Sequence, residues 1–277
     1  MGFKCGIVGL PNVGKSTLFN ALTASKNAEA ANFPFCTIDP NIGIVDVVDQ
    51  RLDKLSKLSN SKKKIYANIT FVDIAGLVKG ASKGEGLGNK FLSHIREVDA
   101  IVHLVRCFDS NKITHVNSEI NPQNDLETIK TEIVLSDIDV IQKKLEKGKK
   151  KILNEKEIKL LENNLSKLNE GKSVIYNSDE ERKFLFRLGL LSMKPKIIVC
   201  NVDEESVIKG NKYTEMVKIK NKDEKIIFIC ADIEDQLTGL SSNEKETFMK
   251  DIGLNKTGLN QLIKEGYDLL NLDTFFT

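Results

Sequence analysis

Gly9-Leu10-Pro11-Asn12-Val13-Gly14-Lys15-Ser16-Thr17 is the most informative segment of this chain. It follows an apolar, strand-like run at 3–8 and leads into a helical pattern at 18–24. The spacing Gly-x4-Gly-Lys-Ser lets successive backbone N–H groups surround a phosphate at the positive end of a helix. We expect Lys15 to reach the β- and γ-phosphates and the Ser16 hydroxyl to take one Mg²⁺ position. The stretch therefore predicts a P-loop that binds a nucleoside triphosphate.

The composition of the chain sets only broad limits on its domain organisation, partners and location. The chain has 277 residues, 40 % hydrophobic and 29 % charged, which is enough to bury a core in one large domain or in a domain with an insertion. The net charge of +2 is too small to argue for a nucleic-acid partner by itself. The five cysteines form no Cys-x-x-Cys pair and are expected to be reduced. No apolar run approaches a membrane span and the P-loop leaves no room for a signal peptide, so a cytoplasmic protein is expected.

Strand-like runs alternate with helical patterns along the chain. Besides the run at 3–8, they fall at 42–48, 69–74, 100–107, 196–201 and 226–231. Apolar strands that alternate with helices favour a largely parallel sheet with helices on both faces. The predicted fold class is α/β, a three-layer P-loop domain that binds its ligand at the carboxyl ends of the strands.

A helical insertion is predicted between residues 107 and 196, because this gap is far too long for one crossover helix. Apolar residues recur at steps of three and four from Leu126 to Leu145 and again from Ile158 to Leu168, which predicts two antiparallel helices in a coiled-coil hairpin. The break at 143–151 is rich in lysine, so the projecting end is expected to be positive. It is either simply solvated or a contact for RNA. The predicted domains are 1–122 with 193–277, and the inserted 123–192.

Candidate Mg²⁺ and switch residues follow the P-loop. Asp73 ends the run at 69–74, where it can hold Mg²⁺ through water, and the N–H of Gly76 can sense the γ-phosphate. Thr37 lies between the P-loop helix and the next strand, where a GTPase-like switch places its Mg²⁺-binding threonine. The glycine-rich segment 79–88 is expected to be a mobile second switch.

Two positions depart from the usual GTPase pattern. Leu77 follows Gly76, where Ras-like proteins carry a water-orienting glutamine, so intrinsic hydrolysis should be slow or use another group. Asn201-Val202-Asp203-Glu204 stands where guanine-specific proteins carry Asn-Lys-x-Asp. The longer carboxylate of Glu204 disturbs the bidentate contact with guanine, so adenine is favoured over guanine. Ala231 and Asp232, on the following loop, are expected beside the base.

The chain resembles the Obg-like ATPases of the YchF family. The resemblance runs through the whole chain and is carried most specifically by Met1 to Thr17, by Asn32-Phe33-Pro34-Phe35-Cys36-Thr37-Ile38, by Phe71 to Asn89 and by Gly266 to Leu272. It implies a Mg²⁺-dependent ATPase with an Obg-type nucleotide domain, a coiled-coil hairpin and a role on the ribosome. It also implies a potassium ion near Asn12 and a role in hydrolysis for His115. The polar loop alone favours an ordinary loop residue at this position. Family members continue into a TGS domain that would follow residue 277, so this domain is expected to be absent here.

The sequence therefore predicts a nucleotide site with three groups of residues. His103 is not among these residues, because it lies inside an apolar run and is expected in the core. The expected catalytic residues are His115, Lys15 and Gly76, the expected nucleotide contacts are Asn12, Val13, Gly14, Lys15, Ser16, Thr17, Phe35, Asn201, Val202, Glu204, Ala231 and Asp232, and the expected Mg²⁺ ligands are Ser16, Thr37 and Asp73.

The predicted function is a Mg²⁺-dependent ATPase that switches between nucleotide states on the ribosome, either on its large subunit or on the whole particle. Two alternatives stay open at this point. One is an Obg-type GTPase, which differs at the base motif. The other is a nucleotide-gated module that binds ribosome or RNA and hydrolyses nucleotide only incidentally, as Leu77 suggests.

Overall fold

The computed structural model describes residues 3–24, 41–75, 87–110, 119–148 and 153–276. The chain divides into two compact units. One consists of Met1–Gly76, Val98–Gln123 and Pro195–Thr277, and the other of Leu77–Glu97 and Asn124–Lys194. The second unit thus contains the segment 77–97 in addition to the predicted insertion.

The first unit is built on a six-stranded sheet in the order β2-β3-β1-β4-β5-β6. The runs predicted from sequence all form strands: β1 (Lys4–Val8), β2 (Asn41–Val47), β3 (Ala67–Asp73), β4 (Ala100–Arg106), β5 (Lys196–Asn201) and β6 (Lys225–Ile229). Among the strands in the described ranges, β2 alone runs antiparallel to its neighbour, β3, and the other pairs are parallel. The predicted fold class, a mostly parallel α/β sheet of P-loop type, is confirmed.

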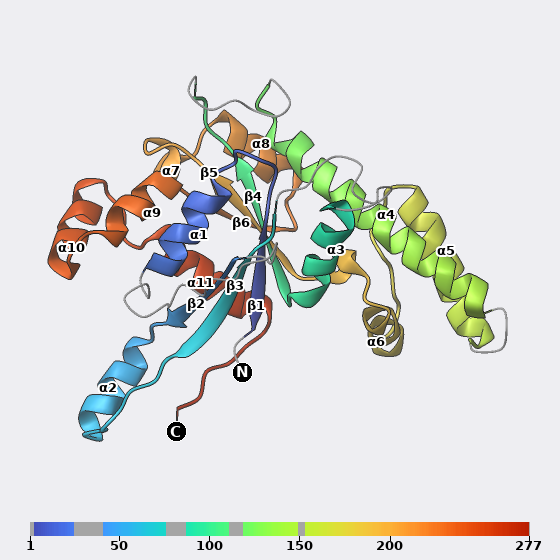
Figure 1. The fold of residues 1–277 in the computed structure, drawn as a ribbon, viewed down its shortest axis with the longest axis horizontal. Helices are drawn as coiled ribbons and strands as arrows, with labels where there is room; N and C mark the ends of the chain where they lie inside the picture. The colour runs from blue at the N-terminus through green and yellow to red at the C-terminus, as the bar shows by residue number, and fades with distance from the viewer. Residues whose placement is uncertain (1–2, 25–40, 76–86, 111–118, 149–152, 277) are drawn as a thin grey trace. The chain divides into compact units, whose positions relative to one another are not determined.

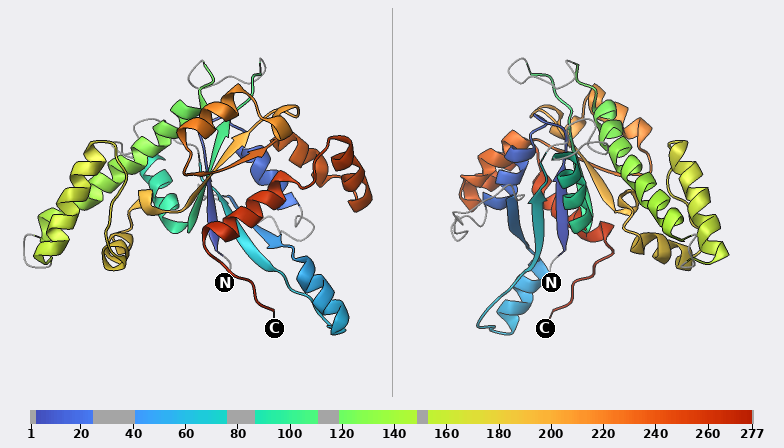
Figure 2. Two further views of the ribbon diagram at one scale, coloured as in Figure 1. Left: turned by 180° about the vertical axis from the view of Figure 1, so that it is seen from behind. Right: turned by 45° about the vertical axis from the view of Figure 1, so that its right-hand side comes forward.

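The helices of this unit are α1 (Lys15–Ala24), α2 (Gln50–Leu58), α7 (Ser206–Lys209), α8 (Lys212–Lys220), α9 (Ala231–Thr238), α10 (Ser242–Asp251) and α11 (Gly258–Leu269). Helix α1 packs on β1, β2 and β3 and against α9, while α11 packs on β5 and β6 (Figure 2). Every residue of β4 is buried, as expected for a central parallel strand. The sheet thus forms the core that holds the strand ends in place.

Strand register brings the carboxyl ends of β1, β3, β4 and β5 to one edge of the sheet (Figure 1). Ile7 pairs with Asp73, and Arg106 pairs with Asn201. Residues far apart in the sequence therefore meet beside the loop that leaves β1, the edge at which ligands bind in such sheets.

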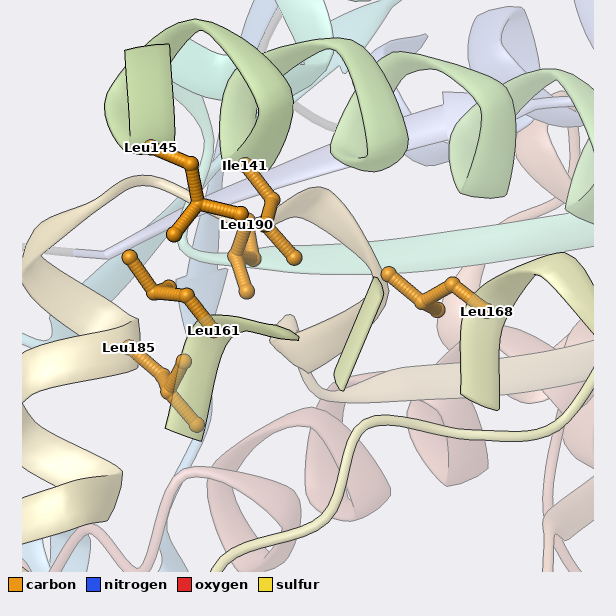
Figure 3. Close-up of a cluster of buried hydrophobic side chains, with 6 residues drawn as sticks. All are labelled: Ile141, Leu145, Leu161, Leu168, Leu185 and Leu190. Carbon is orange, nitrogen blue, oxygen red and sulfur yellow. The ribbon is translucent and has the colours of Figure 1, made fainter. Parts of the chain in front are cut away.

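The second unit is helical and consists of α3 (Leu87–Glu97), nearly all of α4 (Pro122–Gly148), α5 (Glu155–Asn169), α6 (Asp179–Arg187) and the short 3₁₀ helix η1 (Leu191–Met193). Helix α5 returns alongside α4, as the hairpin prediction required. Six buried aliphatic side chains form a core between these helices and the chain that follows them: Ile141 and Leu145 of α4, Leu161 and Leu168 of α5, Leu185 of α6, and Leu190 just before η1 (Figure 3). Such a core stabilises helices that would be marginal alone.

The helical insertion differs from the prediction in one place and adds one helix to it. Helix α4 continues to Gly148, so the predicted break at 143–151 starts too early. Leu145 explains the difference, because its side chain is buried in the hairpin core and holds the last turns of α4. The lysines at 149–151 lie outside the described residues. Helix α6 was not predicted at all, although Ser178 caps it by accepting from the N–H of Glu181 at 3.2 Å.

Buried polar side chains fix the turns of the helical unit. Asn164 donates to the carbonyls of Leu160 and Ile175, both at 3.0 Å, and accepts from the N–H of Ile175 at 2.8 Å. Asp137 accepts from the N–H groups of Leu191 and Ser192 at 2.7 and 2.8 Å, which satisfies the start of η1. Each contact pairs backbone groups that would otherwise be buried without partners.

Candidate nucleotide-binding site

The loop between β1 and α1 has the backbone of a phosphate cradle. Asn12 and Gly14 both have positive φ values, 64° and 94°, so the chain turns sharply before α1 begins at Lys15. The carbonyl of Gly14 accepts from the N–H of Leu18 at 3.0 Å, so the helix starts directly from the loop. Ser16 is exposed and Thr17 half-buried at this helix start. The free N–H groups of the first turn and the helix dipole together favour an anion here.

Gly14 is required for steric as well as conformational reasons. A Cβ atom at this position would lie 2.2 Å from Nδ2 of Asn201. Because φ is also in the left-handed region, any other residue would be strained and would displace Asn201. The glycine therefore allows the P-loop to approach the end of β5.

Asn201 joins the P-loop to the loop after β6. Its Nδ2 donates to the carbonyl of Val13 at 2.9 Å, and its Oδ1 accepts from the N–H of Ala231 at 3.1 Å. The residue is only 4 % exposed. Sequence reasoning expected Asn201 at the base, and the structure places both ends of its amide in contacts that hold two loops of the site together.

Lys15 and Asp73 form an ion pair at the carboxyl edge of the sheet. The Nζ of Lys15 contacts Oδ1 of Asp73, and the side chains are only 13 % and 9 % exposed. Strand pairing explains the contact, because Asp73 ends β3 next to Ile7 of β1. The structure thus brings together the lysine expected to bind phosphate and the carboxylate expected to support Mg²⁺.

The expected base-binding residues lie around the start of α9. Val202 is 2 % exposed and its N–H donates to the carbonyl of Ile229 at 2.9 Å. Glu204 and Asp232 are exposed, while Ala231 is buried. The carboxylates of Glu204 and Asp232 are therefore the accessible side chains of this set.

Several expected residues lie outside the described part of the chain: Phe35, Thr37, Gly76, Leu77 and His115. The histidine expected in the core, His103, is 6 % exposed within β4. Burial lowers its pKa to about 3, so its imidazole is neutral at physiological pH.

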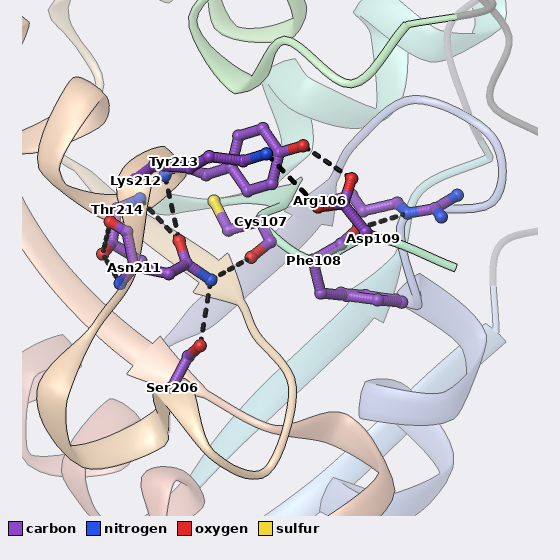
Figure 4. Close-up of polar contacts among 9 residues, drawn as sticks. All are labelled: Arg106, Cys107, Phe108, Asp109, Ser206, Asn211, Lys212, Tyr213 and Thr214. Carbon is purple, nitrogen blue, oxygen red and sulfur yellow. Dashed lines mark hydrogen bonds and ion pairs between the residues drawn. The ribbon is translucent and has the colours of Figure 1, made fainter. Parts of the chain in front are cut away.

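Sequence reasoning missed the polar network that shapes the chain after β4 (Figure 4). The guanidinium of Arg106 is fully buried and donates to the carbonyls of Phe108 and Ser110 at 3.1 and 3.3 Å. Asn211, which caps α8, donates to the carbonyl of Cys107 at 2.7 Å. A pocket of about 320 Å³ lies next to this network and is lined by Phe108, Asp109, Asp203, Asn211, Lys212 and Tyr213. An arginine at the end of an apolar strand was the available signal, since a buried cation needs such partners.

A buried carboxylate, Glu234, ties α9 to α11. Its Oε1 accepts from the N–H of Gly258 at 2.6 Å, at the first turn of α11, and the residue is 3 % exposed. Burial raises the pKa of Glu234 to about 7. Because Ala231 and Glu234 lie on the same helix, this contact helps to hold the loop that Asn201 also holds.

No helix in the described part of the chain has both the length and the apolar composition needed to cross a membrane.

Comparisons with known proteins agree with this geometry. A family model described as "50S ribosome-binding GTPase" matches residues 4–164. The "Ribosome-binding ATPase YchF" of Bacillus subtilis (strain 168) is 46 % identical over 289 residues, covering 100 % of this chain and 78 % of that protein. The protein of the same name from Escherichia coli O157:H7 is 46 % identical over 286 residues with the same coverage. The solved structure of the Schizosaccharomyces pombe YchF GTPase superimposes with a TM-score of 0.83 at 36 % identity, covering 98 % of this chain and 76 % of that one. With the P-loop, the Lys15–Asp73 pair and the Asn201 bridge in place, this chain belongs to the YchF family of P-loop nucleotide hydrolases.

Proposed function

We propose that this chain is a Mg²⁺-dependent ATPase that hydrolyses ATP to ADP and switches between nucleotide states on the ribosome. The observation that carries the proposal is the P-loop fixed by Asn201 beside the Lys15–Asp73 pair. The ammonium of Lys15 and the carboxylate of Asp73 fit a metal–triphosphate ligand because one binds phosphate oxygens and the other binds a divalent cation. Mg²⁺, when bound, neutralises charge on the phosphate oxygens.

In this proposal each site residue has one task. Gly14 and the N–H groups at the start of α1 bind phosphate, and Lys15 reaches the γ-phosphate. Ser16 and Thr37 would be direct Mg²⁺ ligands, and Asp73 would hold the metal through water. We also assign His115 to hydrolysis, Gly76 to sensing the γ-phosphate, Phe35 to contact with the nucleotide and Asn12 to binding a potassium ion.

The base is proposed to be adenine. Guanine recognition in this fold uses a lysine and an aspartate at the positions of Val202 and Glu204. The burial of Val202 and the exposure of the longer Glu204 carboxylate support a different base edge. Glu204 can accept from the exocyclic amine of adenine, with Ala231 and Asp232 alongside.

Ribosome association is proposed from the relatives, whose names describe ribosome-binding ATPases. We place the protein in the cytoplasm on the same ground, and we propose that the positive end of the α4–α5 hairpin contacts RNA.

The description "GTPase" of the matching family and of the fission-yeast structure supports one alternative, an Obg-type GTPase. Leu77, in place of a water-orienting residue, keeps open a binding module with incidental hydrolysis.

Calorimetric titration with ATP and with GTP in Mg²⁺ buffer tests which base the protein prefers. ATP should bind more tightly, and Glu204→Gln should weaken ATP binding by up to about tenfold, because the neutral amide oxygen accepts a weaker hydrogen bond than the carboxylate does. Glu205→Gln is the matched control, since Glu205 is an exposed neighbour. Tighter binding of GTP by the unaltered chain would place it with the Obg-type GTPases.

Phosphate release from ATP, measured with and without ribosomes, tests the switch. Lys15→Ala should abolish release, because it removes the ammonium group that this proposal places at the γ-phosphate. Ribosomes should stimulate release by the unaltered chain. If ribosome binding were the same with ATP, with ADP and in Lys15→Ala, the protein would be a binding module whose hydrolysis is incidental.

A further inference from the structure

The segment between β2 and β3 forms a projecting arm with an unusual charge. This basic arm comprises residues 49–66, that is, α2 and the chain that returns from it to β3. In Figures 1 and 2, α2 and the first part of β3 extend beyond the rest of the sheet. No residue of α2 is buried. The side chains of α2 are therefore at least partly exposed to solvent all around the helix.

The charge of the basic arm exceeds that of the whole chain. Within 49–66 there are two carboxylates, Asp49 and Asp53, and six cations: Arg51, Lys54, Lys57, Lys62, Lys63 and Lys64. This excess of four positive charges compares with a net charge of only +2 for all 277 residues. Positive charge is thus concentrated on the arm while the remainder of the protein is slightly acidic.

Both carboxylates are used to organise the basic arm. Asp49 caps α2 by accepting from the N–H of Arg51 at 2.8 Å, and it pairs with the guanidinium of Arg51 at 2.6 Å. Asp53 accepts from Lys64 and from the hydroxyl of Tyr66, both at 2.5 Å, which fastens the returning chain to α2. These contacts fix the arm's shape without neutralising its other lysines.

Four lysines of the basic arm remain available. Lys54 and Lys57 are three residues apart on α2 and so share a face, while Lys62 and Lys63 lie on the returning chain. All four are exposed, and none forms an ion pair with any residue that the structure describes. Next to them, Leu58 and Ile65 are 81 % and 69 % exposed. The arm therefore presents free ammonium groups from two sides together with aliphatic surface.

The basic arm lies at the opposite end of the sheet from the nucleotide site. Val47 pairs with Ala67 at the arm, whereas Asn41 pairs with Asp73 at the P-loop edge. These two pairs are six residues apart along β3, which corresponds to roughly 20 Å. Changes in the arm can therefore be made without touching the P-loop.

We propose that the basic arm is a second contact with RNA, in which Lys54, Lys57, Lys62 and Lys63 bind backbone phosphates. A cluster of lysines without ion-pair partners indicates a polyanionic partner. RNA offers phosphates to these lysines, and its riboses and bases offer surface that Leu58 and Ile65 can contact. An anionic membrane fits less well, because α2 is only nine residues long and offers three leucines and no aromatic ring to the lipid. The choice of RNA rests on the proposed ribosome association.

The test is binding of a fluorescein-labelled RNA hairpin by the full chain, followed by anisotropy over a series of KCl concentrations. The arm variant is Lys54→Gln, Lys57→Gln, Lys62→Gln and Lys63→Gln together. The control variant carries the same loss of charge at four exposed lysines elsewhere in the same unit: Lys209→Gln, Lys220→Gln, Lys222→Gln and Lys256→Gln. Both should keep the circular dichroism and the ATP affinity of the unaltered chain.

The arm variant should bind the RNA at least about tenfold more weakly and show a salt dependence shallower by about two to four in log–log slope. The control should change affinity by no more than a small fraction of that. Equal losses in the two variants would overturn the inference, since net charge would then explain the binding. Binding of phosphatidylserine vesicles that depends on the same lysines, with no binding of RNA, would overturn it in favour of a membrane.

Sedimentation with ribosomes separates this inference from the proposed function. If the unaltered chain sediments with ribosomes and the arm variant does so equally well and binds the hairpin normally, only the arm proposal fails. If the arm variant loses the hairpin but the unaltered chain never sediments with ribosomes, the arm binds RNA and the ribosomal role fails.

Discussion

Asn201 connects parts of the nucleotide site that are 188 residues apart in the sequence. Replacing it by alanine removes the donor to the carbonyl of Val13 and the acceptor from the N–H of Ala231. Both backbone groups then stay buried without a partner, which destabilises a fold by about 1–3 kcal/mol for each group. We therefore expect Asn201→Ala to lower the free energy of unfolding by about 2–5 kcal/mol.

The same substitution should weaken nucleotide binding beyond its effect on stability. Without the amide, neither the P-loop carbonyl nor the start of α9 is held in place, so the phosphate cradle and the base loop must be ordered by the ligand itself. Asn164→Ala is the matched control, because Asn164 is also fully buried and also bonds backbone groups, but in the helical unit. It should lower stability by a similar amount and leave the affinity unchanged.

Two measurements check this reasoning. Urea unfolding followed by circular dichroism gives the change in stability, and calorimetric titration with ATP in Mg²⁺ buffer, well below the unfolding midpoint, gives the affinity. If Asn201→Ala lost stability but bound ATP as tightly as Asn164→Ala does, the bridge would serve only the fold. If it lost no stability, the two hydrogen bonds of Asn201 would contribute nothing and the argument from burial would be refuted.

Three further changes test other contacts. Gly14→Ala should abolish ATP binding in calorimetry, because its Cβ would lie 2.2 Å from Asn201 Nδ2, and normal binding would show that the P-loop can shift. Glu234→Gln should match the unaltered chain in urea unfolding near pH 4.5 but be more stable by about 3 kcal/mol at pH 8. Burial raises the pKa of Glu234 to about 7 in the folded chain, which therefore keeps a proton that the unfolded chain releases. The free energy of unfolding of the unaltered chain should fall as pH rises from about 4.5 through 7. A difference in stability between the two chains that did not change with pH would contradict this. Asp137→Ala should destabilise the helical unit by about 2–5 kcal/mol in urea unfolding, since it leaves two N–H groups of η1 unpaired, and should leave ATP affinity unaltered.

Much of the architecture could be predicted from the sequence because it depends on near neighbours. Each of the six strands is an apolar run of a few residues, and the P-loop is a contiguous motif whose glycines and helix start act locally. The two long helices of the hairpin followed from their apolar spacing. Helix α6 was not predicted because its apolar residues are few. The end of α4 was placed too early because the lysines from Lys143 onward were taken as the break, although Leu145 continues the apolar spacing and is buried in the core.

A P-loop protein of α/β class with a helical insertion, and a site that contains both Lys15 and Asp73, could be predicted from the residues alone. The antiparallel direction of β2, the bridge that the Asn201 amide makes between two loops, and the burial of Glu234 against α11 become visible in the folded chain. The difference lies in the distance along the chain over which each interaction acts. Propensity, apolar periodicity and backbone motifs act between residues close in sequence, whereas hydrogen-bond partners and burial depend on which distant segments the folded chain brings into contact.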